Sequence, residues 1–354
     1  MRDWVHIIGG GAAGLSLAEQ LCNIGDLPGK IILSDPDITK IKDKSFGYWY
    51  TEKEKHILTP NYSWERWSFS TKEKQFCHKG NKYFYGLSTG EQIFEKIFEK
   101  IENHPRVEIR AEKITCAPSA DYVFDSRPIP KNDFWIKQTF VGWVLTCEDR
   151  HPFRDAQLMC DMQANSDGLN FRYLLPINNK QLLVEYTDFS QSMERFHFLE
   201  NQVKVWCETN IKSKYRVDRV ESACIPMGYN RQREHFGIPI GVRGGLARSS
   251  TGYSFRASHY WARDISSRLK SNKPIKEYHC SYKQDWMDNR LLWLIENWPQ
   301  CLPSIFLAMG ERLSGDRFAR FMTKTDIFTA LSVISAVPKF PFLISSLKSI
   351  SWKR

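Results

Sequence analysis

The segment that decides the fold is residues 4–18, which read WVHIIGGGAAGLSLA. An apolar, partly β-branched run comes first, three consecutive glycines follow, and a run of good helix formers completes the segment. This order predicts a strand, a tight turn and a helix. Residues 30–34 add a second apolar run that ends at Asp35. Two strands with a helix between them predict a βαβ unit at the start of the chain.

The glycines of this unit have the spacing Gly9-x-Gly11-x-x-Gly14. Gly9 permits a tight turn, Gly11 lets the backbone approach a pyrophosphate, and Gly14 lets the helix pack closely on the strand. The start of the helix, which includes Ala13, offers amide donors and positive potential to phosphates. Asp35 is placed at the end of the second strand to accept a ribose hydroxyl. The pattern predicts dinucleotide binding, and the alternative is a glycine turn in an ordinary α/β fold.

The rest of the chain adds further segments to this unit. Ser88-x-x-Glu91 has the form of a capping box, and apolar residues at 3-and-4 spacing predict a helix over 89–103. Residues 107–114 and 121–125 are predicted strands. Between about residues 136 and 235, β segments such as 138–144 and 182–186 predict a separate antiparallel layer, and a helix near 193–209 lies among these segments. The chain ends in a helical region with breaks at Pro338 and Pro341.

These segments predict an α/β fold with three parts. A Rossmann-like FAD-binding domain comprises residues 1–60, 88–135 and 236–270. A substrate-binding antiparallel β domain comprises 61–87 and 136–235, and residues 271–354 form a helical, membrane-facing C-terminal region. FAD is favoured over NAD because the glycine motif lies near the start and later segments return to the sheet after a large insertion, as in two-domain flavoproteins.

Composition narrows the class of protein. The chain has 354 residues with 50 Lys and Arg against 40 Asp and Glu, so its net charge of +10 favours anionic partners. The basic residues are dispersed and no nucleic-acid-binding motif accompanies them, so we expect an anionic membrane surface and no nucleic acid. A mean hydropathy of −0.45 argues against a polytopic membrane protein. Nine scattered cysteines without a C-x-x-C pair, and no signal peptide pattern, predict a cytoplasmic protein with reduced thiols.

Five motifs behind the glycine turn carry a family resemblance. In order along the chain they are Phe124-Asp125-Ser126-Arg127-Pro128, Gln138-x-Phe140-x-Gly142-Trp143, Phe171-Arg172-Tyr173-Leu174-Leu175-Pro176, Leu183-Val184-Glu185-Tyr186-Thr187 and Ser250-Thr251-Gly252-Tyr253-Ser254-Phe255. The chain resembles bacterial lycopene β-cyclases of the flavoprotein type over most of its length, and Ile225-Pro226-Met227 also fits. Three sites depart from the family pattern: Lys44 to Trp49 replace an Arg-Thr-Trp-x-Phe-Trp-like run, Tyr186 stands where many members have a second acid, and Arg248-Ser249-Ser250 lacks a proline.

The resemblance implies a function. An enzyme of this family closes rings at the ends of a linear carotenoid such as lycopene, and it is a redox-neutral isomerase that depends on reduced FAD, with NADPH or NADH as electron donor. The first step needs an acid, and Glu185 lies in an apolar strand. If it faces a cavity, desolvation raises its pKa and keeps it protonated near neutral pH. The alternative is a surface glutamate on an edge strand.

Further candidates have open interpretations. Asp125 and Arg127 either bind ribose or pyrophosphate or form a structural ion pair. Arg172 and Tyr173 either line the cavity mouth or pack within the sheet, and Tyr186 is a further candidate for substrate binding. Gly244, Gly245, Thr251 and Gly252 either give the flavin a second set of backbone contacts or form only a loop. The histidines show no metal-ligand spacing and no G-x-S-x-G elbow is present, so we expect neither a metal site nor a serine hydrolase.

Two other functions fit the same fold. An FAD-dependent monooxygenase or a prenyl-chain reductase would act on a similar hydrophobic substrate, although a hydroxylase is expected to show Gly-Asp-Ala where this chain has Gly241-Val242-Arg243. A non-catalytic flavin- or carotenoid-binding protein is the alternative from another class.

The C-terminal segment, residues 323–354, mixes basic and apolar residues. Its basic residues are Lys324, Lys339, Lys348, Lys353 and Arg354, and its apolar ones include Ile327, Phe328, Leu331, Ile334, Phe340, Leu343 and Trp352. Because the prolines interrupt this run, it is predicted to lie in the interface of an anionic membrane rather than to span it, which makes the protein peripherally membrane-associated. The alternative is a helix pair that closes the core.

Overall fold

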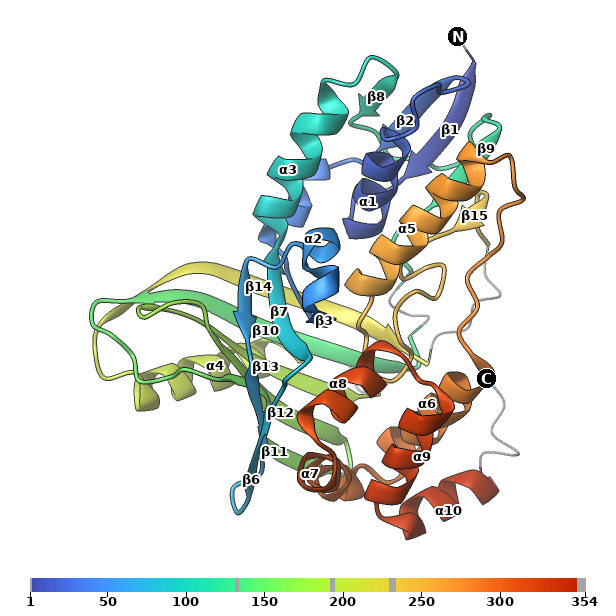
Figure 1. Ribbon diagram of the computed structural model, residues 1–354. Helices are drawn as coiled ribbons and strands as arrows, with labels where there is room; N and C mark the ends of the chain where they lie inside the picture. Colours follow the sequence, from blue (N-terminus) through green and yellow to red (C-terminus); the bar gives the residue numbers. More distant parts are fainter. Residues whose placement is uncertain (1, 131–133, 192–194, 229–233, 349–354) are drawn as a thin grey trace.

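The structure is a computed structural model that describes residues 2–130, 134–191, 195–228 and 234–348. It contains three sheets and a set of C-terminal helices (Figure 1). The predicted α/β class is confirmed: a parallel sheet with helices lies at one end, and a large, mostly antiparallel sheet lies below it in the view of Figure 1.

The parallel sheet has the strand order β15-β9-β1-β2-β8. Its strands are β15 (Ile238–Pro239), β9 (Tyr122–Asp125), β1 (Asp3–Ile8), β2 (Lys30–Ser34) and β8 (Val107–Arg110). Helices α1 (Ala12–Leu21), α3 (Gly90–Glu102) and α5 (Phe255–Lys270) pack beside one another against it (Figure 1). The predicted strand, turn and helix at the start are confirmed, as is the helix that follows Ser88.

The large sheet has the strand order β14-β10-β13-β12-β11-β5-β6. Its strands are β14 (Tyr215–Met227), β10 (Ile136–Cys147), β13 (Gln181–Ser190), β12 (Gly168–Pro176), β11 (Ala156–Asn165), β5 (Arg66–Ser70) and β6 (Gln75–Lys79). All neighbours are antiparallel except β11 and β5. Helix α4 (Phe196–Asn210) covers one face through Leu199 and Val203, which pack on Val184 and Leu145. The other face is therefore left for the remaining parts of the chain.

A small sheet lies between the parallel sheet and the large sheet. It consists of β3 (Ser45–Thr51), β7 (Tyr83–Thr89) and β4 (Tyr62–Trp64), with the short helix α2 (Lys55–Leu58) between β3 and β4. Strand β3 comes from the segment assigned to the FAD-binding domain, whereas β4 and β7 up to Leu87 come from the segment assigned to the substrate domain. The small sheet thus crosses the boundary expected at residue 60, and the domain limits stay a prediction.

The C-terminal helices are α6 (Tyr282–Asn297), α7 (Leu302–Arg312), α8 (Gly315–Thr323), α9 (Ile327–Ala336) and α10 (Lys339–Lys348). They lie together at the end of the large sheet (Figure 1). In the described part of the chain no single helix is long and apolar enough to cross a membrane, and α9 with α10 passes that test only as a pair bent by 114°. Pro338 lies at this bend. The second expected break is wrong, because Pro341 lies in the first turn of α10, where proline is tolerated.

Candidate active site

A cavity of about 720 Å³ lies between the uncovered face of the large sheet, the small sheet and the C-terminal helices. Most of its walls are apolar and aromatic. Strands of the large sheet contribute Phe140, Leu158, Phe171, Leu183, Phe189, Ala223 and Ile225, and the small sheet contributes Phe46, Trp49, Tyr85 and Leu87. The helices contribute Leu291, Ile305, Phe306, Met309, Phe318, Phe321, Val333, Val337 and Phe342. Such a lining suits a hydrophobic ligand.

Polar side chains form one row across the sheet floor of this cavity. Cross-strand pairing aligns Glu221 of β14 with Gly142 of β10, Gly142 with Glu185 of β13, and Glu185 with Tyr173 of β12. Directly opposed residues of neighbouring strands point to the same face of a sheet, and the three side chains all line the cavity. Gly142 has no side chain, so no side chain of β10 stands between the two glutamates in this row.

Glu185 is the central acid of the row. Its Oε1 accepts a hydrogen bond of 2.7 Å from the hydroxyl of Thr187, two residues further along the same face. Burial raises the pKa of Glu185 to about 8, and the negative charge of Glu221 adds to the effect, while the Thr187 bond opposes it. The expectation of a carboxyl group that faces an apolar cavity agrees with this geometry. Glu185 is thus protonated near neutral pH and can donate its proton.

Three tyrosine hydroxyls meet beside this acid. The hydroxyl of Tyr85 is hydrogen-bonded to that of Tyr173 and lies 3.4 Å from that of Tyr253. A side chain at Gly47 would overlap the Tyr85 hydroxyl, so this glycine in the unusual run of residues 44–49 makes room for the cluster. Burial raises the pKa values of Tyr173 and Tyr253, and the nearby Glu185 contributes. The phenols therefore stay neutral as polar groups in the apolar cavity.

Glu221 is held in place by polar contacts from two strands. The guanidinium of Arg219 lies 2.7 Å from its Oε1, and the hydroxyl of Ser45 donates to the same oxygen at 2.6 Å. Burial raises the pKa of Glu221, while Arg219, Ser45 and the ammonium of Lys44 oppose that rise. Sequence analysis did not select Glu221. One sequence pattern could have indicated it: Glu221, Ala223 and Ile225 are every second residue of one strand and therefore face the same side, which is the cavity.

Arg172 and Tyr186 do not line the cavity, so their expected contact with substrate is wrong. Each is next in sequence to a cavity residue, and successive side chains of a strand point to opposite faces. Arg172 pairs with Asp161 at 2.9 Å and lies 4.6 Å from the Trp206 ring centroid. Tyr186 packs in the core beneath α4. Of the three substrate candidates, only Tyr173 faces the cavity.

The glycine motif forms the turn expected of it. Gly9 has a φ of +101°, and a side chain at Gly14 would overlap the Gly9 carbonyl oxygen, so helix and strand pack as closely as predicted. Gly11 is the N-cap of α1, and a Cβ there would meet nothing within 4 Å. No side chain caps α1, and its first turn has no acid. Asp35 accepts hydrogen bonds from the backbone amides of Gly10 and Asp37 at 2.6 and 2.7 Å, which fixes its carboxylate beside the turn.

The loop of residues 241–252 connects this turn to the cavity. A side chain at Gly241 would contact Ala13 in the first turn of α1, and Val242 lines the cavity. Gly244 is packed against the Pro239 carbonyl, and Gly245 and Gly252 both have a φ of +72°. Thr251 and Gly252 lie at the cavity wall. The loop thus extends from the start of the glycine helix to the polar row.

Asp125 and Arg127 form the structural ion pair that was one of their two interpretations. The Asp125 carboxylate is fully buried, lies 2.7 Å from Arg127 Nη2 and accepts the amide hydrogen of Phe236 at 3.0 Å. The guanidinium of Arg127 lies over the Phe236 ring, with its Cζ 3.3 Å from the centroid. Because Asp125 has no exposed surface, the interpretation as a ribose ligand is wrong for this residue.

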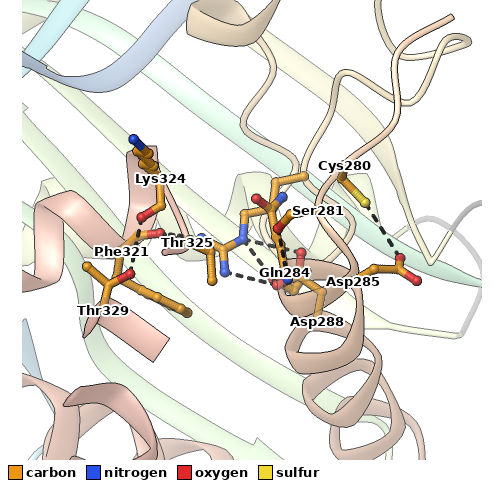
Figure 2. Close-up of polar contacts among 11 residues, drawn as sticks. Cys280, Ser281, Gln284, Asp285, Asp288, Phe321, Lys324, Thr325 and Thr329 are labelled. Atoms are coloured by element: carbon orange, nitrogen blue, oxygen red, sulfur yellow. Dashed lines mark hydrogen bonds and ion pairs between the residues drawn. The ribbon is translucent and has the colours of Figure 1, made fainter. Parts of the chain in front are cut away.

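A buried ion pair fastens the same loop to the C-terminal helices. Arg248 donates to Asp288 of α6 at 3.0 Å and to the carbonyl of Phe321 of α8 at 2.8 Å. Figure 2 labels these two partners, Asp288 and Phe321. The hydroxyl of Ser250 also donates to Asp288, at 2.8 Å. These contacts fix the loop at the place where a proline of the family pattern is replaced. The loop is therefore held against the helices that cover the cavity by hydrogen bonds and an ion pair.

The residues present fit a flavin dinucleotide. The uncapped amides of α1 and the open space at Gly11 suit a pyrophosphate. In the described residues, the buried Thr251 Oγ1 and Gln138 Oε1, both in the cavity wall, have no hydrogen-bond partner. A polar ring bound between the loop and β10 would satisfy both atoms. The arrangement is thus suited to hold the two ends of one long cofactor.

Solved structures share this fold. A geranylgeranyl bacteriochlorophyll reductase-like protein from Thermoplasma acidophilum has a TM-score of 0.57 at 13% identity, with 99% of each chain covered. The flavin-dependent brominase Bmp2 has a TM-score of 0.54 at 9% identity, again with 99% of each chain covered. The p-nitrophenol 4-monooxygenase PnpA from Pseudomonas putida DLL-E4 has a TM-score of 0.53 at 12% identity and covers 99% of this chain and 97% of its own. At these identities the likeness shows the fold alone.

The family follows from the sequence model that matches the chain. The model described as "Lycopene cyclase protein" matches residues 4–345, and the chain belongs to this family. No curated protein matches the sequence significantly. The resemblance found in the five ordered motifs is confirmed.

Proposed function

We propose that the protein is a carotenoid cyclase that closes rings at the linear ends of a polyene such as lycopene, by acid-initiated chemistry without net redox change. The observation that carries this proposal is Glu185, a buried carboxyl group in a mostly apolar cavity, where burial raises its pKa to about 8. A terminal alkene has no lone pair, so its activation needs a proton from a strong enough donor in a dry site. Membership of the lycopene cyclase family supports the choice of substrate.

The chain's own residues account for the main requirements of the reaction. Glu185 delivers the proton to the terminal double bond. The aromatic rings of Trp49, Tyr85 and Phe318, whose side chains all line the cavity, face a carbocation with polarisable π surfaces and exclude water that would capture it. The cation then closes to a ring and loses a proton, so the product is an isomer of the substrate.

FAD is the proposed cofactor, in its reduced form. The start of α1, Gly9, Gly11 and Asp35 would hold its dinucleotide part, and Thr251 and Gly252 its ring. When bound and reduced, the flavin would supply negative charge that stabilises the cation. NADPH or NADH would serve only to keep the flavin reduced. In this proposal the flavin transfers no electrons to the substrate. A monooxygenase or a reductase would instead use the flavin as an electron donor.

The outer face of α9 and α10 is the proposed contact with an anionic membrane. Phe328, Leu331, Phe340 and Leu347 are each more than half exposed, and Lys324, Lys339 and Lys348 lie on or beside the same helices. Ile334 and Leu343 are both exposed and part of the cavity wall, so the mouth of the cavity opens at this face. A polyene dissolved in a bilayer could enter there without crossing water. Trp352, Lys353 and Arg354 lie outside the described residues.

The experiment is an anaerobic assay of the purified protein with lycopene in liposomes, FAD and dithionite. A cyclised product that forms only with reduced FAD supports the proposal. A product that gains oxygen would favour the monooxygenase, and one that gains two hydrogens would favour the reductase. Carotenoid that binds but is recovered unchanged would favour the non-catalytic binding protein.

A further inference from the structure

Cyclisation must end with the removal of a proton, and the cavity holds a second carboxylate that is placed for this step. Among the described residues that line the cavity, the carboxyl groups belong to Glu185, Glu221 and Asp288. Asp288 already accepts hydrogen bonds from Arg248 and Ser250. Glu221 lies in the same cross-strand row as Glu185, on the far side of Gly142.

The spacing of this row suits a ring between the two acids. Neighbouring strands lie about 4.8 Å apart, so the two strand spacings from β13 through β10 to β14 separate the backbones of Glu185 and Glu221 by about 10 Å. Both side chains line the cavity, and no side chain projects from Gly142 into the space between them. A Cβ at Gly142 would lie 3.3 Å from the Cβ of Glu185, so even a small side chain would reduce that space.

The charges around the two glutamates differ. Within the described residues, the Thr187 hydroxyl is the hydrogen-bond donor to Glu185, whereas Glu221 has the guanidinium of Arg219 at 2.7 Å, the Ser45 hydroxyl and the nearby ammonium of Lys44. Positive neighbours favour an ionised carboxylate. Environments that separate the protonation states of two carboxyl groups are the usual way in which one site provides both an acid and a base.

We propose that Glu221 is a second catalytic residue, the base that takes the proton from the cyclised cation, and that its position determines where the ring double bond forms. This inference rests on the proposed cyclase function. It assigns the acid and the base of one reaction to two different side chains on either side of Gly142.

The steps balance in atoms and electrons. The O–H proton of Glu185 bonds to the terminal alkene carbon through the π electrons of that alkene, which leaves a tertiary cation. The π electrons of the next reacting double bond form the ring C–C bond and move the cation into the ring. Glu221 then takes a proton from a neighbouring carbon, and the C–H electrons become the ring double bond. Glu221 passes its proton to water and Glu185 regains one, so no oxidant or reductant is consumed.

The test compares Glu221→Gln, Glu221→Asp and wild-type protein, each with lycopene and reduced FAD. Glutamine keeps the size of the side chain and an oxygen for Ser45 but cannot accept the proton as a carboxylate does. We expect it to lower turnover at least tenfold and to change the product mixture, with shifted ring double bonds or a tertiary alcohol formed by water. Glu221→Asp should restore part of the wild-type isomer ratio. Flavin absorbance and thermal unfolding show whether each variant is loaded and folded.

The outcomes separate the inference from the proposed function. If wild-type protein makes no cyclised product, the proposed function fails and the inference fails with it. Suppose instead that wild-type protein cyclises lycopene and that Glu221→Gln gives the same isomers. If its turnover equals that of wild type, or falls only as far as its flavin content falls, Glu221 is not the base. A changed isomer ratio in flavin-loaded Glu221→Gln, partly reversed in Glu221→Asp, supports the inference, because a purely structural role would lower the rate without moving the double bond.

Discussion

Glu185 and Glu221 face one cavity from strands β13 and β14, with only Gly142 of β10 between them. One carboxyl group is surrounded by apolar walls and tyrosine hydroxyls, and the other lies against Arg219 and Ser45. The site thus combines an acid that is kept neutral with a carboxylate that has positive neighbours. This relationship underlies the mechanism proposed for the protein, and the loop of residues 241–252 joins it to the dinucleotide turn.

Replacement of Gly11 by valine should remove the flavin without unfolding the chain. A Cβ at Gly11 would meet no atom within 4 Å, so the added side chain would extend into the space offered to the pyrophosphate. We expect the flavin absorbance of purified Gly11→Val to fall by more than tenfold, while unfolding of the flavin-free proteins stays similar. Gly25→Val is the matched control, because a Cβ at Gly25 also meets nothing within 4 Å, in a loop beyond the far end of α1. Full flavin content in Gly11→Val would show that the dinucleotide lies elsewhere.

Glu185→Gln should abolish cyclisation while the flavin still binds. Loss of a general acid typically lowers the rate by roughly 10²- to 10⁴-fold, so a loss of less than about a hundredfold would count against the role. Asp188→Asn is a suitable control. Asp188 is a buried carboxyl of the same strand that does not line the cavity, so its replacement should leave the chemistry intact. Turnover and flavin content of both variants are measured together.

The protonation of Glu185 predicts two pH effects. Turnover should fall as pH rises through about 8, because the protonated form that donates the proton disappears. The unfolded chain has a glutamate pKa near 4.5, so between pH 4.5 and 8 the native state binds more protons and wild-type stability should decrease with pH at this site. Glu185→Gln should therefore gain stability relative to wild type, on the order of a few kcal/mol, from pH 5 to pH 8. A stability difference that stays constant over this range would contradict the protonated, buried acid.

Membrane binding should depend on the exposed face of α9 and α10. The double variant Phe328→Gln and Phe340→Gln changes side chains that are 74% and 64% exposed, so the fold should persist. Its co-sedimentation with anionic liposomes should fall severalfold, and binding of the wild type should weaken with salt. Phe198→Gln with Val205→Gln, on exposed positions of α4, is the control. If the two double variants bind the liposomes equally well, α9 and α10 do not form the membrane contact.

Sequence patterns predicted the parts of this fold that depend on local order. The glycine turn, α3 and the strands that contain Glu185 and Gln138 follow from spacing and periodicity within short segments. The row that joins Glu221, Gly142 and Glu185 depends on the register between β14, β10 and β13, which no local pattern specifies. Arg172 and Tyr173 were both candidates for the cavity mouth, although neighbouring residues of a strand face opposite ways, and only Tyr173 lines the cavity. The ion pair of Arg248 with Asp288 joins residues 40 positions apart and could not be predicted from either segment.

The most direct test of the central claim is the mass of the product formed from lycopene in D₂O under anaerobic conditions with reduced FAD. Proton delivery by an exchangeable acid such as Glu185 predicts that each ring formed contains one deuterium. Apart from this exchange of hydrogen for deuterium, the product should have the composition of the substrate. A cyclised product without deuterium, or a product that has gained oxygen or two hydrogens, would contradict acid-initiated, redox-neutral cyclisation.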